Sequence, residues 1–226
     1  MPRTYRVTQV NPAEDLLSKA RGPYSTVLAD PPWQFQNRTG KVAPEHRRLL
    51  RYPTMELKEI MGLPVARLAA AKSHLYLWVP NALLQEGLSV MAAWGFTYKS
   101  NLVWYKIRMD GGPDGRGVGF YFRNVTELVL FGVRGSMRTL QPGRTQVNLL
   151  STRKREHSRK PDEFAKLVEA CSPGPYLELF ARFRRKGWHQ WGNEDVEANS
   201  FHGVAKRKAH VDPQLRLLKS PRGYGT

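Results

Sequence analysis

Cysteines, metal-ligand clusters and long apolar segments are scarce in this chain. Cys171 is the single cysteine, so no internal disulfide and no thiol-based zinc site are expected. The six histidines lack metal-ligand spacing, and we therefore expect no metal. No apolar run approaches the roughly 20 residues that span a bilayer, and the charged start of the chain does not resemble a signal peptide. These absences predict a cytoplasmic protein with no membrane partner.

Acidic residues are also few compared with basic ones. The 226 residues include 36 Lys and Arg against 19 Asp and Glu, which gives a formal net charge of +17. Such an excess favours a polyanionic partner, and nucleic acid is the first candidate. A membrane surface is the weaker alternative, because the sequence shows no long amphipathic basic helix. The length suggests one domain, which we place at residues 1–198, followed by a basic flexible tail over 199–226.

Short apolar runs alternate with segments of helical periodicity. Strands are expected at 25–30, His74–Val79, 97–106, Glu127–Val133, Tyr176–Phe180 and Trp188–Trp191. Helices are expected at 54–61, at 81–94 with Asn81 as N-cap and Gly95 as terminator, and at 161–170. Long loops are expected at 34–53, 108–119 and 135–160. This alternation predicts an α/β fold with a mostly parallel sheet and helices on both faces.

The tetrapeptide Asp30-Pro31-Pro32-Trp33 follows the first apolar run and therefore lies at the end of a predicted strand. Open α/β sheets build their sites at the carboxyl ends of strands. The carboxylate of Asp30 can accept a hydrogen bond from an amino group, the prolines stiffen the turn, and an exposed Trp33 offers a stacking face. The alternative is a plain strand-ending turn with a half-buried tryptophan.

The tetrapeptide and five further blocks, in this order, resemble the MT-A70 family of adenine-N6 methyltransferases. The six blocks are Leu28–Trp33, Leu75–Val79, Glu127–Gly135, Ser158–Glu163, Glu178–Arg182 and Trp191–Asn193. The resemblance covers roughly residues 24–194. It implies a Rossmann-like methyltransferase fold in which the catalytic motif precedes the cofactor-binding strand, a permuted order. It also implies S-adenosylmethionine as the cofactor.

The resemblance implies a role for each matching residue. Asp30 and the carbonyl of Pro31 would accept the two hydrogens of adenine N6, and Trp33 and Tyr52 would pack against the base. The implied cofactor-binding residues are Asp30, Lys160, Phe180, Arg182, Asn193 and Glu194. The implied substrate-binding residues are Tyr52, Glu127 and Lys160, together with Arg47 and Arg48 on phosphates.

Some of these residues have ordinary structural explanations. Phe180 is equally well explained by core packing, a solvated basic run is the weaker explanation of Lys160, and Trp78 is best explained as core. Cys171, in a helical pattern, is best explained as an inert buried thiol. The sequence also departs from the family pattern, since no glycine-rich turn follows the cofactor strand and Glu194 stands where many relatives carry glutamine.

Three functions stay open at this point. The leading interpretation is a DNA adenine-N6 methyltransferase of bacterial or phage type. The second is the same chemistry on RNA, and the third is a non-catalytic nucleic-acid-binding subunit. A homodimer or a pairing with a related subunit is compatible with each, and S-adenosylmethionine binding discriminates the third from the others.

Overall fold

The computed structural model describes residues 11–34, 54–115, 121–141, 143–153 and 160–192, which are organised around one seven-stranded sheet. The strands lie in the order β5-β3-β4-β2-β1-β6-β7. Their bounds are β1 Tyr24–Ala29, β2 Ala69–Val79, β3 Thr97–Ile107, β4 Thr126–Arg134, β5 Leu149–Arg153, β6 Tyr176–Leu179 and β7 Trp188–Trp191. β4 runs antiparallel to its neighbours β2 and β3, and every other pairing is parallel. The predicted Rossmann-like, mostly parallel α/β sheet is confirmed.

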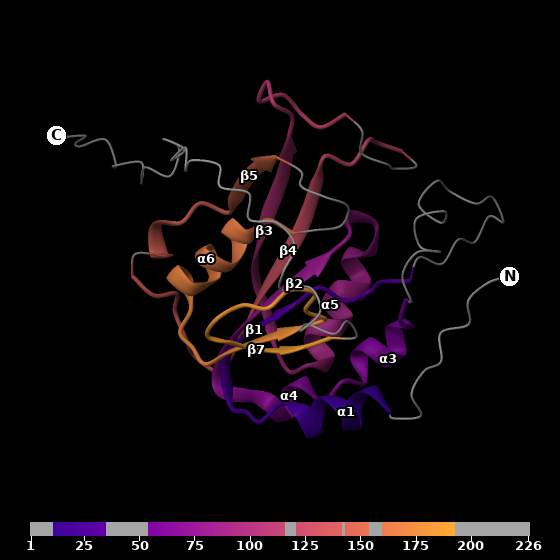
Figure 1. Cartoon of the computed structure of the whole chain (residues 1–226), viewed down its shortest axis with the longest axis vertical. Coiled ribbons are helices and arrows are strands. Elements are labelled where there is room, and N and C mark those ends of the chain that lie inside the picture. The colour runs from indigo at the N-terminus through magenta and orange to yellow at the C-terminus, as the bar shows by residue number, and fades with distance from the viewer. Residues whose placement is uncertain (1–10, 35–53, 116–120, 142, 154–159, 193–226) are drawn as a thin grey trace, which may run out of the picture.

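Helices cover both faces of this sheet (Figure 1). Their bounds are α1 Pro12–Lys19, α3 Leu57–Met61, α4 Val65–Leu68, α5 Leu84–Ala93 and α6 Asp162–Cys171, with short 3₁₀ turns at Asn81–Leu83 and Gly143–Thr145. Among the described helices, α6 is the one that packs against one face, and α1, α3, α4 and α5 pack against the other. Among the described residues, no helix is long and apolar enough to cross a membrane.

The central strand β2 shows why both faces are covered. Successive side chains of a strand point to opposite faces, and in β2 both sets are apolar or aromatic. Leu75 and Leu77 join the cluster beneath α5, whereas Tyr76 and Trp78 join the cluster beneath α6. The α6 helix contributes Phe164 and other apolar residues to that second cluster. A strand buried on both sides is typical of the middle of an α/β sheet.

Three sequence expectations were wrong in detail. β5 lies inside the segment expected to be a loop, because this edge strand alternates exposed and half-buried residues and lacks an apolar run. β2 begins at Ala69 rather than at His74, since its first five residues are small or polar and lack an apolar run, and Ala71 and Lys72 are exposed. Asn81 does not cap α5, because a 3₁₀ turn over Asn81–Leu83 precedes the helix and Leu83 is its N-cap. The amide nitrogen of Asn81 donates to the carbonyl and hydroxyl of Thr126, at 3.2 and 3.1 Å. Gly95 does follow the end of α5, with a φ of 79°.

The carboxyl edge of the sheet gathers the chain segments that carry the predicted site. β1 and β6 are neighbours, and their register pairs Ala29 with Leu179, so Asp30 and Phe180 leave adjacent strands at the same level. β4 is reversed and therefore begins at this edge, which places Glu127 there as well. Lys160 reaches the edge from the residues just before α6.

Candidate active site

The Asp30–Trp33 turn is held by three hydrogen bonds. The carbonyl of Pro31 accepts from the backbone N–H of Trp33 at 2.8 Å, and the carbonyl of Pro32 accepts from that of Met55 at 2.9 Å. The indole N–H of Trp33 donates to the carbonyl of Trp78 at 2.9 Å. These bonds make the turn a stiff platform for the Asp30 carboxylate.

Trp33 does not lie where its stacking role requires. Its side chain belongs to the apolar core and the residue is only 7% exposed. The expectation of an exposed stacking face was wrong, because the indole N–H needs an acceptor when buried and finds one on β2. Trp33 therefore anchors the turn to the sheet.

The Asp30 carboxylate lies beside the ammonium group of Lys160. The Oδ1 atom of Asp30 is 3.2 Å from Nζ of Lys160, and both side chains are 27% exposed. Lys160 is thus no freely solvated member of a basic run. Burial lowers the pKa of Lys160, but the charges of Asp30 and Glu127 outweigh burial and raise this pKa above its ordinary value. Lys160 therefore stays protonated at neutral pH.

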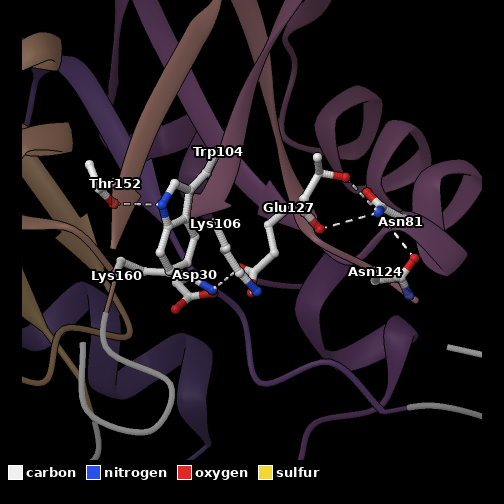
Figure 2. Close-up of polar contacts among 9 residues, drawn as sticks. Asp30, Asn81, Trp104, Lys106, Asn124, Glu127, Thr152 and Lys160 are labelled. Carbon is white, nitrogen blue, oxygen red and sulfur yellow. Dashed lines mark hydrogen bonds and ion pairs between the residues drawn. The ribbon is translucent and has the colours of Figure 1, made fainter. Parts of the chain in front are cut away.

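Glu127 lies between two lysines. Its Oε2 atom accepts from Lys160 at 2.8 Å, and its Oε1 atom accepts from Lys106 at 2.5 Å. Burial raises the pKa of Glu127, but the two ammonium groups outweigh burial and bring it to about 2. Figure 2 shows the resulting cluster, in which Asp30, Lys160, Glu127 and Lys106 converge with alternating charge.

Two tryptophans support the lysines of this cluster. The ammonium of Lys160 lies 4.7 Å from the ring centroid of Trp78, and that of Lys106 lies 4.8 Å from that of Trp104. The two indoles meet edge to face, with centroids 5.9 Å apart. Trp78 is 2% exposed, which confirms its prediction as a core residue. The indole N–H of Trp104 donates to the hydroxyl of Thr152 on β5 at 2.8 Å (Figure 2).

Phe180 occupies a special backbone position directly after β6. Its φ is 62°, in the left-handed region that non-glycine residues seldom adopt. Its half-buried ring packs edge-on against Trp191 at 5.4 Å, and the next residue, Ala181, donates its N–H to the carbonyl of Trp191 at 3.0 Å. Strained residues that persist are often part of a functional site. Phe180 is therefore only partly explained by core packing.

The remaining predicted residues divide into placed and undescribed ones. Arg182 is half-buried in the connection between β6 and β7. The residues Arg47, Arg48, Tyr52, Asn193 and Glu194 lie outside the described residues. Cys171 is buried as expected, and burial raises the pKa of its thiol. Gly192 packs so closely on the carbonyl of Ala181 that a side chain has no room there.

Sequence reasoning missed Lys106. The available signal was its position two residues after Trp104, on the same face of a strand, in a hairpin whose register pairs Trp104 with Glu127. Without knowledge of that pairing, nothing in the local sequence marks a lysine near the end of a strand as part of a site.

The fold and the charged edge together define a class of protein. A Rossmann-like sheet with an acid-and-proline turn after β1, an aromatic residue directly after the neighbouring β6 and a lysine just before α6 is the architecture of a nucleotide-modifying methyltransferase. The MT-A70 family model matches residues 24–194, which is most of the chain. The chain belongs to the MT-A70 family of S-adenosylmethionine-dependent adenine-N6 methyltransferases.

The curated relatives differ in how much of their length the chain spans. It is 30% identical over 207 residues to the Mycoplasma protein "Type II methyltransferase M.MunI", covering 83% of this chain and 84% of that protein. It is 28% identical to human "N(6)-adenine-specific methyltransferase METTL4" over 77% of this chain and 38% of that protein. It is 25% identical to human "N(6)-adenosine-methyltransferase catalytic subunit METTL3" over 76% of this chain and 28% of that protein. The chain thus spans most of the bacterial relative and well under half of the two human relatives.

Proposed function

We propose that this protein transfers a methyl group from S-adenosylmethionine to N6 of adenine in DNA. The observation that carries this proposal is the Asp30 carboxylate, presented at the carboxyl edge of the sheet on a turn held by three hydrogen bonds. S-adenosylmethionine would supply the methyl group on a positively charged sulfur and leave as S-adenosylhomocysteine, and the methylated N6 would release one of its hydrogens to solvent as a proton. The protein must supply an oriented amine and a place to bind the cofactor, and the described residues fit both tasks.

Asp30 and Pro31 orient the amine in this proposal. Adenine N6 is a poor nucleophile because its lone pair is delocalised into the ring. Acceptors for both N6 hydrogens favour the geometry in which that lone pair is directed at the methyl group. Asp30 accepts one hydrogen, and the carbonyl of Pro31, which uses one lone pair on Trp33, has a second for the other. Most of the rate then comes from positioning and preorganised polar groups.

Stacking on the target base falls to Tyr52 in this proposal, because Trp33 is buried. Tyr52 follows the turn in the sequence and carries an aromatic ring suited to a flat base. The base must first leave its stack or come from a single strand, as for other enzymes that modify nucleobases. Arg47 and Arg48 would grip the surrounding phosphates and add salt-dependent affinity.

The cofactor would lie between Lys160 and Phe180. The ammonium of Lys160 has three N–H donors, of which Asp30 and Glu127 take two, so one is available for a cofactor carboxylate. The half-buried ring of Phe180 and the side chain of Arg182 would border the cofactor at the end of β6. Asn193 and Glu194 would accept hydrogen bonds from its ribose.

Glu127 acts in this proposal by holding Lys160. Both of its carboxylate oxygens are occupied by lysines, and its pKa of about 2 makes it a weak base. Glu127 was predicted to bind the substrate. In this proposal it instead holds the ammonium group of Lys160 in place, and Asp30 is the acceptor that faces the amine.

DNA is the favoured polymer because the bacterial type II methyltransferase matches over nearly the whole of both chains. RNA is the second candidate, because relatives named N(6)-adenosine methyltransferases match the same region of this chain. We further propose that the protein works in the cytoplasm. Light scattering in solution with and without nucleic acid tests whether it forms the homodimer compatible with the family.

Methyl transfer from labelled S-adenosylmethionine to matched DNA and RNA, single- and double-stranded, tests the proposal. We expect label at adenine N6 of DNA, and at least a 100-fold loss in both Asp30→Ala and Asp30→Asn. Asn keeps the shape of Asp but changes the charge, so equal loss in both variants points to the carboxylate itself. Asp110→Asn, on an exposed loop, is the matched control.

Each alternative has its own outcome. Label in RNA alone replaces DNA by RNA and leaves the Asp30 chemistry intact. Cofactor binding without transfer to any substrate indicates a missing partner subunit. Failure of the wild-type protein to bind the cofactor in calorimetry, together with retained nucleic-acid binding, supports the non-catalytic subunit and overturns the proposal.

A further inference from the structure

Lys106 is a partly hidden charge at the end of β3. Its side chain is 14% exposed, and its ammonium contacts Glu127 at 2.5 Å above the ring of Trp104. Its backbone is held from both sides, since its N–H donates to the carbonyl of Val125 at 2.8 Å and its carbonyl accepts from Asp114 at 2.9 Å. A sequestered ammonium is costly unless it is paired, so this position has a specific partner.

That partner is one link in a chain of four alternating charges. Lys106 neutralises Oε1 of Glu127, Oε2 of Glu127 accepts from Lys160 at 2.8 Å, and Lys160 lies 3.2 Å from Asp30. The contact between Lys160 and Asp30 is the longest of the three. Lys160 is therefore shared between two carboxylates, and the share that Asp30 receives depends on how strongly Glu127 competes for it.

Lys106 sets that competition. With Lys106 present, one oxygen of Glu127 is satisfied and only the other needs Lys160. Without it, an oxygen of the half-buried Glu127 carboxylate loses its partner, and a partly desolvated charge without a partner is unfavourable. Glu127 would then draw the Lys160 ammonium toward both of its oxygens and away from Asp30.

We propose that Lys106 is a positioning residue of the methyl-transfer site, which acts through Glu127 and Lys160 on the placement of the Asp30 carboxylate. The inference rests on the proposed role of Asp30 in orienting the amine. The competing explanation is a purely structural ion pair that ties β3 to β4, and it makes no link between Lys106 and Asp30.

Kinetics of single variants separate the two explanations. Lys106→Met keeps the apolar stem against Trp104 but removes the charge, and we expect kcat to fall about tenfold. Lys106→Arg restores the charge and should recover at least half of kcat. Lys99→Met, on the exposed part of the same strand, is the matched control and should leave kcat unchanged. Lys106→Gln replaces Lys106→Met if the latter does not fold.

A double variant tests the route. In a Glu127→Gln background the charge that Lys106 neutralises is absent, so adding Lys106→Met should lower kcat by less than twofold further. A full tenfold loss in that background would show that Lys106 acts without Glu127. An unchanged kcat in Lys106→Met alone would equally overturn the proposal.

A crystal structure of Lys106→Met tests the inference without any activity. We expect Nζ of Lys160 to lie more than about 4 Å from Asp30 in this variant and to keep its wild-type place in Lys106→Arg. An unchanged contact between Lys160 and Asp30 contradicts the inference even if the wild-type enzyme is active. A wild-type protein that neither binds S-adenosylmethionine nor methylates any substrate would instead refute the proposed function, while the structural comparison still decides the role of Lys106.

Discussion

The two ends of α6 meet β2 through polar networks of opposite character. Before the first turn of α6, Lys160 lies over Trp78 of β2 and joins the charged cluster of Asp30 and Glu127. After its last turn, Ser172 joins His74 and Tyr76 of the same strand in a network without formal charge. His74, Tyr76 and Trp78 alternate along one face of β2, so one strand and one helix form both networks.

Hydrogen-bond geometry assigns the direction of the neutral network. His74 Nε2 faces the carbonyl of Met137 at 3.2 Å and must donate to it. His74 Nδ1 therefore accepts from the hydroxyl of Ser172 at 2.7 Å, and that oxygen accepts from Tyr76 at 2.7 Å. In this three-residue network each side-chain donor has an acceptor, and His74 and Ser172 are 0% exposed.

The difference between the charged and the neutral network indicates where the protein can bind a ligand. The neutral network is closed to solvent and complete, which suits a contact that maintains the fold. In the charged network Asp30 and Lys160 are each 27% exposed, and within the part of the chain that the structure describes one N–H of Lys160 has no carboxylate partner. Four substitutions or conditions test this division.

The largest effect is expected at Lys160. Lys160→Met should lower kcat/KM about 100-fold, because it removes the charge shared by Asp30 and Glu127, and loss of such a partner costs about 3 kcal/mol or more. Steady-state methylation assays measure it. Lys166→Met, on the exposed side of α6, is the control and should stay within twofold of wild type. A similar loss in both variants would show that the effect belongs to α6 as a whole.

The neutral network should respond in stability instead. Ser172→Ala leaves the ring nitrogen of His74 and the hydroxyl of Tyr76 without their partner, and should lower the free energy of unfolding by about 1–3 kcal/mol. Chemical denaturation measures this change, with kcat at a permissive temperature expected to stay near wild type. Ser89→Ala, an exposed serine bonded to the carbonyl of Gln85, should change stability by less than about 0.5 kcal/mol. Equal changes in the two variants would contradict the assignment.

Acidification should lower the stability of the protein by protonating His74 of the neutral network. Burial lowers the pKa of His74 below 6.5, and the hydrogen bond to Met137 only partly offsets it. The unfolded chain therefore binds a proton more readily, so the stability from this group is present above about pH 6.5 and is lost as pH falls through the folded pKa. We expect a smaller fall in melting temperature between about pH 7.5 and 5.5 in His74→Gln, which keeps a donor and an acceptor but cannot be charged. An identical fall in both proteins would place the acid sensitivity elsewhere.

The smallest effect is expected at Thr152. Thr152→Val leaves the indole N–H of Trp104 without its acceptor, beneath Lys106. The cost should be about 1 kcal/mol in stability, with kcat lowered no more than about threefold. Thr145→Val, in the short 3₁₀ turn after β4, is a comparison outside the charged cluster. A large loss of activity in Thr152→Val would extend the site to β5.

The sequence predicted most of the strands and pointed to Asp30, Glu127 and Lys160, which the structure brings together, for identifiable reasons. β1, β4 and β6 are mostly apolar, β7 begins and ends with tryptophan, and α6 carries proline and acidic residues at its start, so local patterns identify them. β5 was missed because an edge strand needs no apolar run. Lys160 and Glu127 were found through family blocks, and their direct contact was not visible in any local pattern.

The errors at single residues have a common cause. The burial of Trp33 and the partners of Asn81 depend on which segment packs beside them, Trp78 in one case and Thr126 in the other. Lys106 was missed because its role depends on the hairpin register and on a charge 21 residues away. Local sequence carries no information on such contacts, and tertiary packing decides them.

The reversed direction of β4 has a consequence for how the site assembles as the chain folds. β3 and β4 form a hairpin, so the contact between Lys106 and Glu127 closes over only 21 residues. The contact between Lys160 and Glu127 closes over 33 residues, whereas Lys160 and Asp30 are 130 residues apart in the sequence (160 minus 30). Short loops close at lower entropic cost than long ones. We therefore expect the Lys106 and Glu127 half of the cluster to form early, and Asp30 to join it only when β1 inserts between β2 and β6. A chain arrested before that step would carry the charges of the site without the acceptor that orients the amine.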